Sequence, residues 1–160
     1  MLRIAIAGAT GRMGKTLIDT ATSQTQAMLT VATVRPNHPA LGQDIGPVCG
    51  LPPTGVKAVA DLAAVTDSFD VLIDFTSPAV TLKHLELCAA TGKALVIGTT
   101  GFSADEKQLI AAAAEKTAIV LLSLIRPPER STNTVERQRV TSFKNAPRGK
   151  RFQSELREQT

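Results

Sequence analysis

The sequence is poor in the residue types that most often mark special chemistry. None of its 160 residues is tryptophan or tyrosine and only five are phenylalanine, which argues against an aromatic platform that stacks the bases of single-stranded nucleic acid. The two cysteines, Cys49 and Cys88, have neither metal-ligand spacing nor the spacing of a redox pair. Two lone cysteines without an export signal predict a protein of the reducing cytoplasm.

Long hydrophobic runs and histidine clusters are also missing. The first apolar stretch, residues 2–7, is too short for a signal-peptide core or a membrane span, and no later run reaches membrane length. The only histidines are His38, in a Pro- and Gly-rich segment where it could contact an adenine, and His84, which we expect at an exposed or half-buried helix position. The sequence therefore predicts no membrane association, no metal site and no catalytic His/Asp/Ser arrangement.

The charge is unevenly distributed along the chain. The net charge of +4 conceals nine Lys or Arg against ten Asp or Glu in residues 1–125, and nine against four in residues 126–160. A nucleic-acid partner inferred from the pI of about 9.4 would depend on the final segment alone. That segment is polar and lacks apolar periodicity, so we expect a mostly disordered basic tail, residues 126–160, after a folded domain, residues 1–125.

Short apolar runs alternate with helical patterns along the folded part. Strands are predicted at residues 2–7, 29–34, 70–75, 94–97 and 117–122, and helices at 11–23, 57–66, 80–91 and 103–116. Pro78 suits the start of the third helix, and Ser103 with Glu106 has the signature of a capping box. Residues 36–56 contain many Pro and Gly and predict a long loop, functional or mobile. The alternation predicts an α/β fold: a doubly wound parallel sheet of the Rossmann type that binds a dinucleotide.

A glycine-rich turn, Gly8-Ala9-Thr10-Gly11-Arg12-Met13-Gly14, lies between the first predicted strand and the first predicted helix. Gly8 permits a tight turn, Gly11 lets a pyrophosphate approach the backbone, and Gly14 lets the helix pack close to the strand. The free N–H groups and the helix dipole then favour an anion. A plain structural turn would use the same glycines, but the position after a buried strand favours a dinucleotide site.

The end of the second predicted strand bears on the choice between NAD and NADP. An acidic residue there binds the ribose hydroxyls, whereas an arginine accommodates a 2′-phosphate. The sequence has Val34-Arg35 at this point, and Arg12 in the glycine-rich turn is a second phosphate partner. We therefore expect NADPH as the cofactor, with NADH as the other candidate. The alternative for Arg35 is a solvated loop cation.

Two polar segments follow predicted strands, Asp74-Phe75-Thr76-Ser77-Pro78 and Gly98-Thr99-Thr100-Gly101-Phe102. Open α/β sheets bind ligands at the carboxyl ends of their strands, so Thr99 and Thr100 are candidates to contact a nicotinamide or its ribose. The alternative is that they build a turn together with Gly101. Asp74 is either a general base or, as such residues more often are, a group that caps the next helix or orders the turn.

These motifs, taken in order, resemble one family. Residues 6–14 (Ile-Ala-Gly-Ala-Thr-Gly-Arg-Met-Gly), 74–78 and 96–102 resemble 4-hydroxy-tetrahydrodipicolinate reductase, formerly dihydrodipicolinate reductase, within a similarity that covers about residues 2–121. The resemblance implies reduction of a cyclic dicarboxylate, 4-hydroxy-tetrahydrodipicolinate, to tetrahydrodipicolinate with NADH or NADPH, in lysine and diaminopimelate biosynthesis. It implies pyrophosphate contacts from the glycine-rich turn, adenosine-phosphate contacts from the two arginines, and nicotinamide contacts from the two polar segments. The cofactor-binding set so implied is Gly8, Ala9, Thr10, Gly11, Arg12, Met13, Arg35, Thr76, Gly98, Thr99 and Thr100.

The sequence departs from the family at three points. Val34 stands where the family usually has an acid, so the affinity for NADH is expected to suffer. Leu122-Ser123-Leu124-Ile125 replaces the family's Ala-Ala-Asn-Phe-Ser, and nothing matches the His-His-Arg-His-Lys stretch of its substrate domain. We therefore predict weak NADPH binding and no substrate turnover by this chain, and we interpret residues 126–160 as the sign of a frameshifted or truncated gene product.

Three alternatives stay open at this point. The chain could be a catalytically inactive NADP-binding module that associates with a full-length reductase. It could be a nucleic-acid binder that uses its basic tail, which predicts a steep salt dependence. It could be another NADP-dependent reductase, such as a semialdehyde or homoserine dehydrogenase, against which the Gly-Thr-Thr-Gly-Phe segment argues. The resemblance implies homo-oligomers that form through the substrate domain, so it does not predict an oligomeric state for this chain.

Overall fold

The computed structural model describes residues 1–122 and 141–142. Its strands are β1 Leu2–Ala7, β2 Ala27–Thr33, β3 Ala58–Val59, β4 Val71–Asp74, β5 Ala94–Ile97, β6 Ile119–Leu121 and β7 Thr141–Ser142. Its helices are α1 Arg12–Ser23, α2 Ile45–Val48, α3 Pro78–Thr91 and α4 Ala104–Ala113, and a 3-10 segment, η1, spans Ala63–Ser68. In the described part of the chain, no helix is both long enough and apolar enough to span a membrane.

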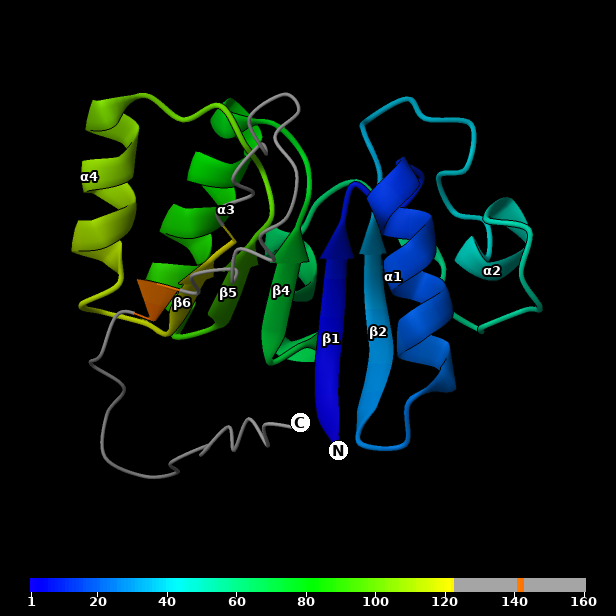
Figure 1. The fold of residues 1–160 in the computed structure, drawn as a ribbon. Coiled ribbons are helices and arrows are strands. Elements are labelled where there is room, and N and C mark those ends of the chain that lie inside the picture. Colours follow the sequence, from blue (N-terminus) through cyan, green and yellow to red (C-terminus); the bar gives the residue numbers. More distant parts are fainter. Residues whose placement is uncertain (123–140, 143–160) are drawn as a thin grey trace, which may run out of the picture.

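One sheet contains all of these strands, in the order β3-β2-β1-β4-β5-β6-β7 (Figure 1). β1 to β6 pair in parallel, and β7 pairs antiparallel with β6. From β1 the chain proceeds outward to β2 and β3, then returns to the other side of β1 for β4, β5 and β6. The strand order therefore reverses between β1 and β4. This arrangement confirms the predicted doubly wound parallel sheet, and its switch point is where such sheets bind ligands.

Two hydrophobic clusters cover the two faces of the sheet, because successive residues of a strand point to opposite sides. Ile6 of β1 shares one cluster with Ile18 of α1. Ala5, its neighbour in β1, belongs to the other cluster, together with Leu85 of α3 and Ile110 of α4. Helices cover both faces of the sheet, which explains why the strands are largely apolar.

The helix predicted over residues 57–66 is wrong. Ala58 and Val59 instead form β3 beside the end of β2, and a 3-10 segment follows that is interrupted at Val65, where φ is −126°. The apolar spacing in this segment is compatible with a short helix. Pairing with β2 decides the outcome, because it gives the backbone of residues 58–59 hydrogen bonds in the sheet.

Residues 36–56 are more ordered than the long loop that their Pro and Gly content predicts. The carboxylate of Asp44 accepts hydrogen bonds from the backbone N–H groups of Gly46, Thr54 and Gly55 at 2.9, 3.0 and 2.7 Å, and from the Thr54 hydroxyl at 2.9 Å. These hydrogen bonds, of which the one from the Thr54 backbone N–H has the largest effect, lower the pKa of Asp44 to about 2. The helix α2 begins directly after Asp44. One carboxylate therefore organises the segment.

The predicted basic tail, residues 126–160, lies outside the described residues except for β7. In β7, Thr141 and Ser142 pair with Leu121 and Val120 of β6.

Candidate cofactor-binding site

A pocket of about 610 Å³ lies at the carboxyl ends of β1, β2 and β4. Its walls come from four segments: the glycine-rich turn after β1, the chain that follows β2, the residue after β3, and the connection from β4 into the first half of α3. The lining residues are Gly8, Thr10, Gly11, Thr33, Val34, Arg35, Pro36, His38, Ala60, Phe75, Thr76, Ser77, Val80 and His84. The pocket therefore occupies the switch point of the sheet.

The glycine-rich turn brings α1 very close to β1. Gly8 has a φ of 73°, in the left-handed region that glycine adopts without steric cost. The N–H of Gly11 donates to the carbonyl of Gly8 at 3.0 Å. A Cβ atom at Gly14 would overlap the carbonyl oxygens of Gly8 and Ala9. The tight-turn role of Gly8 and the packing role of Gly14 are confirmed by this geometry, whereas contact with a phosphate stays a prediction.

Two helices begin at the pocket without a side-chain cap. Gly11 and Ser77 are the N-cap residues of α1 and α3; neither helix has a side-chain cap hydrogen bond or an acidic residue in its first turn. By contrast, α4 contributes no residue to the pocket, and it has a complete capping box between Ser103 and Glu106. The first N–H groups of a helix lack a carbonyl partner one turn earlier and carry the positive end of its dipole, although in α3 Pro78 has no N–H and the Val80 N–H donates to the Ser77 carbonyl at 3.0 Å. The pocket therefore has two helix N-termini suited to an anion.

The chain after β2 contributes a guanidinium and an imidazole to the pocket. Arg35 is exposed, whereas the neighbouring Val34 is 6% exposed. His38 accepts a hydrogen bond from the Ala40 N–H at Nδ1 (3.0 Å), and its Nε2 lies 3.2 Å from Oγ1 of Thr10. Because Nδ1 acts as an acceptor, the ring proton is on Nε2 and His38 donates to Thr10. This bond connects the segment after β2 to the glycine-rich turn.

Five of the predicted cofactor-binding residues line the pocket: Gly8, Thr10, Gly11, Arg35 and Thr76. The remaining predicted residues do not line it. Ala9 is buried beneath the turn, Arg12 and Met13 are exposed on the first turn of α1, and Gly98, Thr99 and Thr100 follow β5. The sequence-based set omits His38 and His84, which do line the pocket.

The segment after β5 is largely committed to internal contacts. The hydroxyl of Thr99, a residue 4% exposed, accepts hydrogen bonds from the Thr76 N–H at 3.1 Å and from the Thr81 hydroxyl at 2.8 Å. A Cβ atom at Gly98 would overlap the ring of Phe75. Thr100 is exposed. Of the two threonines expected at the nicotinamide, Thr99 therefore joins two strand ends, and Thr100 is the one with an accessible hydroxyl.

Asp74 and His84 form a pair that the sequence did not connect. Asp74 ends β4 and is fully buried, and its Oδ2 lies 2.7 Å from Nδ1 of His84 on α3. Its Oδ1 accepts hydrogen bonds from the N–H and the hydroxyl of Thr76 at 2.9 and 2.6 Å. The turn-ordering role of Asp74 is confirmed by these bonds. A signal was present in the sequence: Thr81 and His84 are three residues apart on one predicted helix, directly after the strand that Asp74 ends.

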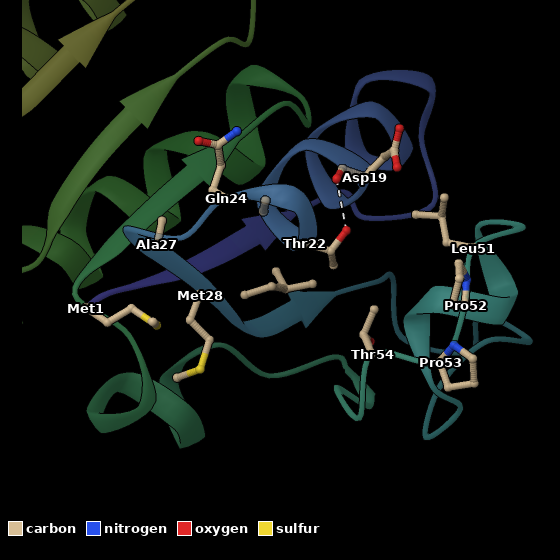
Figure 2. Close-up of a pocket in the computed structure, with 12 residues that line it drawn as sticks. Met1, Asp19, Thr22, Gln24, Ala27, Met28, Leu51, Pro52, Pro53 and Thr54 are labelled. Carbon is tan, nitrogen blue, oxygen red and sulfur yellow. Dashed lines mark hydrogen bonds between the residues drawn. The ribbon is translucent and has the colours of Figure 1, made fainter.

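A second hollow, of about 500 Å³, lies at the opposite end of the sheet, where β1 and β2 begin (Figure 2). Met1, Met28 and Pro53 are among the residues that line it, and the hydroxyl of Thr22 donates to the Asp19 carbonyl at 2.9 Å. Ligands of open α/β sheets bind at the carboxyl ends of the strands, so this hollow is not the candidate site. In residues 1–122, no three His, Cys, Asp or Glu side chains gather as a metal ion would require.

Known proteins resemble this chain over the part that forms the pocket. The family described as the N-terminus of dihydrodipicolinate reductase matches residues 2–123. Proteins named 4-hydroxy-tetrahydrodipicolinate reductase from Methylococcus capsulatus and Hahella chejuensis are 51% and 52% identical to it over 120 residues, which is 75% of this chain and 45% of each relative. The chain therefore spans less than half the length of these curated relatives.

Solved structures agree with the fold. A dipicolinate-bound dihydrodipicolinate reductase from Paenisporosarcina sp. TG-14 is 27% identical with a TM-score of 0.62, over 76% of this chain and 47% of that one. The WlbA dehydrogenase from Chromobacterium violaceum, in complex with NADH and UDP-GlcNAcA, has a TM-score of 0.57 at 17% identity, over 76% of this chain and 34% of that one. The second likeness concerns the fold alone.

Proposed function

The chain belongs to the dihydrodipicolinate reductase family, of which it has the N-terminal part, and we propose that it binds NADPH in the pocket between β1, β2 and β4. The observation that carries the proposal is the convergence of two uncapped helix N-termini on this pocket, one of them preceded by the glycine-rich turn. Free backbone N–H groups and two helix dipoles favour a pyrophosphate over any neutral ligand.

The proposed arrangement assigns one part of the dinucleotide to each wall. Residues 8–13 hold the pyrophosphate, and the adenosine lies beside Arg35. Thr76 and residues 98–100 face the nicotinamide half, where Thr100 offers the accessible hydroxyl. When bound, NADPH supplies the hydride, and the residues of this chain hold and orient it.

We propose a preference for NADPH over NADH because of the residues after β2. The side chain of Val34 has no group that accepts hydrogen bonds from ribose hydroxyls, so one source of NADH affinity is missing. Arg35 lines the pocket next to it, and a guanidinium binds a phosphate through paired, charge-assisted hydrogen bonds. Arg12, exposed on the first turn of α1, adds a second positive charge on the same edge of the sheet.

The activity proposed for the whole family protein is reduction of 4-hydroxy-tetrahydrodipicolinate, a cyclic dicarboxylate, in lysine and diaminopimelate biosynthesis. This chain has two histidines and no His-His-Arg-His-Lys stretch, which the resemblance associates with the proton donor and the cationic dicarboxylate site. We therefore expect the 160-residue chain to bind NADPH without reducing the substrate. A reducing cytoplasm fits its free thiols, Cys49 and Cys88.

A second candidate function follows from the same missing histidines. The chain would act as an NADP-binding module that associates with a full-length reductase and does not itself catalyse. Mixing it with a full-length relative and following the pair by size-exclusion chromatography tests this candidate. Co-elution supports the module, whereas separate elution together with a normal reductase rate of the 160-residue chain would contradict it.

The proposed cofactor is tested by titrating the chain with NADPH and with NADH and following the fluorescence of the reduced nicotinamide. An Arg35→Ala variant removes the cation beside Val34, and Lys107→Ala, on an exposed position of α4, is the matched control. Hydrogen bonds to charged groups contribute about 1.5–3 kcal/mol, so Arg35→Ala should weaken NADPH binding about tenfold or more and change NADH binding little. Failure of the unmodified chain to bind either nucleotide, or an equal loss for both in Arg35→Ala, would contradict the proposal.

A further inference from the structure

A buried carboxylate lies behind the cofactor pocket and is not used by the binding scheme above. Asp74 is 0% exposed, and charged side chains are rarely buried to this degree unless they are paired and hydrogen-bonded. It ends β4, the strand whose carboxyl end forms one wall of the pocket. Its position calls for an explanation beyond the stability of the fold, because burying a carboxylate costs free energy that its hydrogen bonds must offset.

Both oxygens of Asp74 hold groups that line the pocket. Oδ1 accepts from the N–H of Thr76 at 2.9 Å and from its hydroxyl at 2.6 Å. Oδ2 lies 2.7 Å from Nδ1 of His84, whose side chain is 16% exposed. Thr76 and His84 both line the pocket. One carboxylate therefore fixes a loop residue and a helix residue of the same wall.

A layer of threonine hydroxyls extends this network to the next strand. The hydroxyl of Thr81 donates to that of Thr99 at 2.8 Å, and the N–H of Thr76 donates to the same Thr99 oxygen at 3.1 Å. No buried side-chain nitrogen or oxygen among the described residues lacks a hydrogen-bond partner. A fully satisfied polar network of this kind is rigid and specifies a single arrangement. The ends of β4 and β5 and the start of α3 are thus held in one geometry.

The imidazole of His84 is oriented by the same carboxylate. A carboxylate oxygen only accepts hydrogen bonds, so Nδ1 of His84 is the donor. Nε2 is then the ring nitrogen left for a ligand, and in the neutral ring it is an acceptor. Carboxylates commonly fix the tautomer and orientation of a histidine in this way.

We propose that Asp74 is a positioning residue of the cofactor pocket, which acts by holding Thr76 in place and by presenting Nε2 of His84 to a hydroxyl or amino group of the bound dinucleotide. This inference rests on the proposed function. Its effect falls on both nucleotides alike, because neither Thr76 nor His84 belongs to the segment of Val34 and Arg35 that distinguishes NADPH from NADH.

The same strand offers a matched control. Asp70 precedes β4 at the other end of the sheet, where Oδ1 pairs with Nη2 of Arg3 at 2.6 Å and Oδ2 accepts the Arg3 N–H at 3.0 Å. Asp70→Asn and Asp74→Asn are identical chemical changes at opposite ends of one strand. Only Asp74 contacts residues that line the pocket. Positioning therefore predicts that only Asp74→Asn changes nucleotide affinity, and the thermal midpoints of the two variants report separately any loss of stability at the buried Asp74 and the partly exposed Asp70.

The test measures three quantities for the full chain and each variant: the Kd for NADPH and for NADH, the thermal midpoint, and the imidazole ¹⁵N chemical shifts of His84. We expect Asp74→Asn to weaken the binding of both nucleotides about tenfold. We also expect it to exchange the His84 tautomer, because an amide nitrogen in the position of Oδ2 donates to Nδ1. We expect Asp70→Asn to keep both Kd values within twofold. A folded Asp74→Asn variant that binds both nucleotides as the unmodified chain does would overturn the inference.

A second variant covers the case in which Asp74→Asn does not fold. His84→Asn keeps an amide donor near the position of Nδ1 but has no counterpart of Nε2. It should therefore weaken the binding of both nucleotides severalfold and leave the thermal midpoint almost unchanged. Unchanged binding in this variant overturns the inference. If the unmodified chain binds no dinucleotide, the proposed function fails and this inference fails with it, which distinguishes that result from the failure of a variant alone.

Discussion

Nε2 of His38 lies 3.2 Å from Oγ1 of Thr10, so the chain after β2 is hydrogen-bonded to the glycine-rich turn after β1. His38→Ala removes this bond and the one that its Nδ1 accepts from Ala40. A neutral hydrogen bond contributes about 1 kcal/mol. We therefore expect NADPH binding to weaken about fivefold, because the glycine-rich turn and the chain after β2 are no longer held in position relative to each other. Fluorescence titration measures the change.

The control for this variant lies in the same segment. Gln43 is exposed, and its amide donates to the carbonyl of Pro39 at 2.8 Å. Gln43→Ala removes a hydrogen bond of the segment without removing a residue that lines the pocket, so its NADPH affinity should equal that of the unmodified chain. Equal losses in the two variants would mean that general loosening of the segment, and not the bond to Thr10, determines affinity.

Gly11 and Gly14 have different roles, and alanine at each should separate binding from folding. At Gly11 the backbone is extended, with φ −70° and ψ 168°, and a Cβ atom would lie 3.2 Å from the Gly8 carbonyl oxygen. Gly11→Ala should therefore keep most of the stability and lose most of the dinucleotide binding, because the methyl group occupies the path of the pyrophosphate.

Gly14→Ala should have the opposite effect. Its Cβ atom would overlap the carbonyl oxygens of Gly8 and Ala9, and neither is a flexible side chain that could move aside. Overpacking costs about 1–3 kcal/mol, so the free energy of unfolding in urea should fall by about that amount. If Gly14→Ala were as stable as Gly11→Ala, the close approach of α1 to β1 would not depend on glycine.

The sequence predicts the fold and the glycine-rich turn well, because both depend on local patterns. Apolar runs such as residues 94–97 and signals such as Ser103 with Glu106 act over a few residues, and the structure has them as β5 and the start of α4. Residues 57–66 were predicted as a helix because their short apolar spacing fits helix and strand alike. Only pairing with β2, over 20 residues away along the chain, decides it.

The candidate site was predicted less completely than the fold. The contact of Asp74 with His84, ten residues later, depends on how α3 is seated on the sheet, and the contact of His38 with Thr10 depends on the path of the chain after β2. Neither contact can be deduced from the spacing of these residues along the sequence. Thr99 shows the converse: its place after a strand predicted a ligand contact, but its hydroxyl is occupied by Thr76 and Thr81.

Stability should decrease in acid between about pH 4 and pH 2. Hydrogen bonds, chiefly the one from the Thr54 N–H, lower the pKa of Asp44 to about 2. The hydrogen bond from the Arg3 side chain is the main cause that lowers the pKa of Asp70 to about 2. Both values lie below the unfolded pKa of about 3.9. The stabilisation is therefore complete above that pKa and is lost as the pH falls through the folded value. Urea unfolding at stepped pH measures it.

Asp44→Asn isolates one of the two contributions. An asparagine does not titrate, so the free energy of unfolding of this variant should fall less steeply between about pH 4 and pH 2 than that of the unmodified chain. Its stability at neutral pH should be lower, because the amide cannot accept all of the hydrogen bonds that the carboxylate accepts from Gly46, Thr54 and Gly55. An identical pH slope in the two proteins would contradict the assignment.

Val34 is the position at which a single substitution should reverse the preferred nucleotide. Its N–H donates to the Val59 carbonyl at 2.9 Å, which holds the backbone, and the residue, 6% exposed, lines the pocket next to Arg35. In Val34→Asp a carboxylate accepts hydrogen bonds from ribose hydroxyls and repels a 2′-phosphate. We expect the ratio of the NADPH Kd to the NADH Kd to rise at least tenfold. Val34→Asn, similar in shape but neutral, is the control and should shift the ratio far less. A proportional loss of both nucleotides in Val34→Asp would instead mean that the carboxylate only destabilises the end of β2, and the thermal midpoints of the two variants would show this directly.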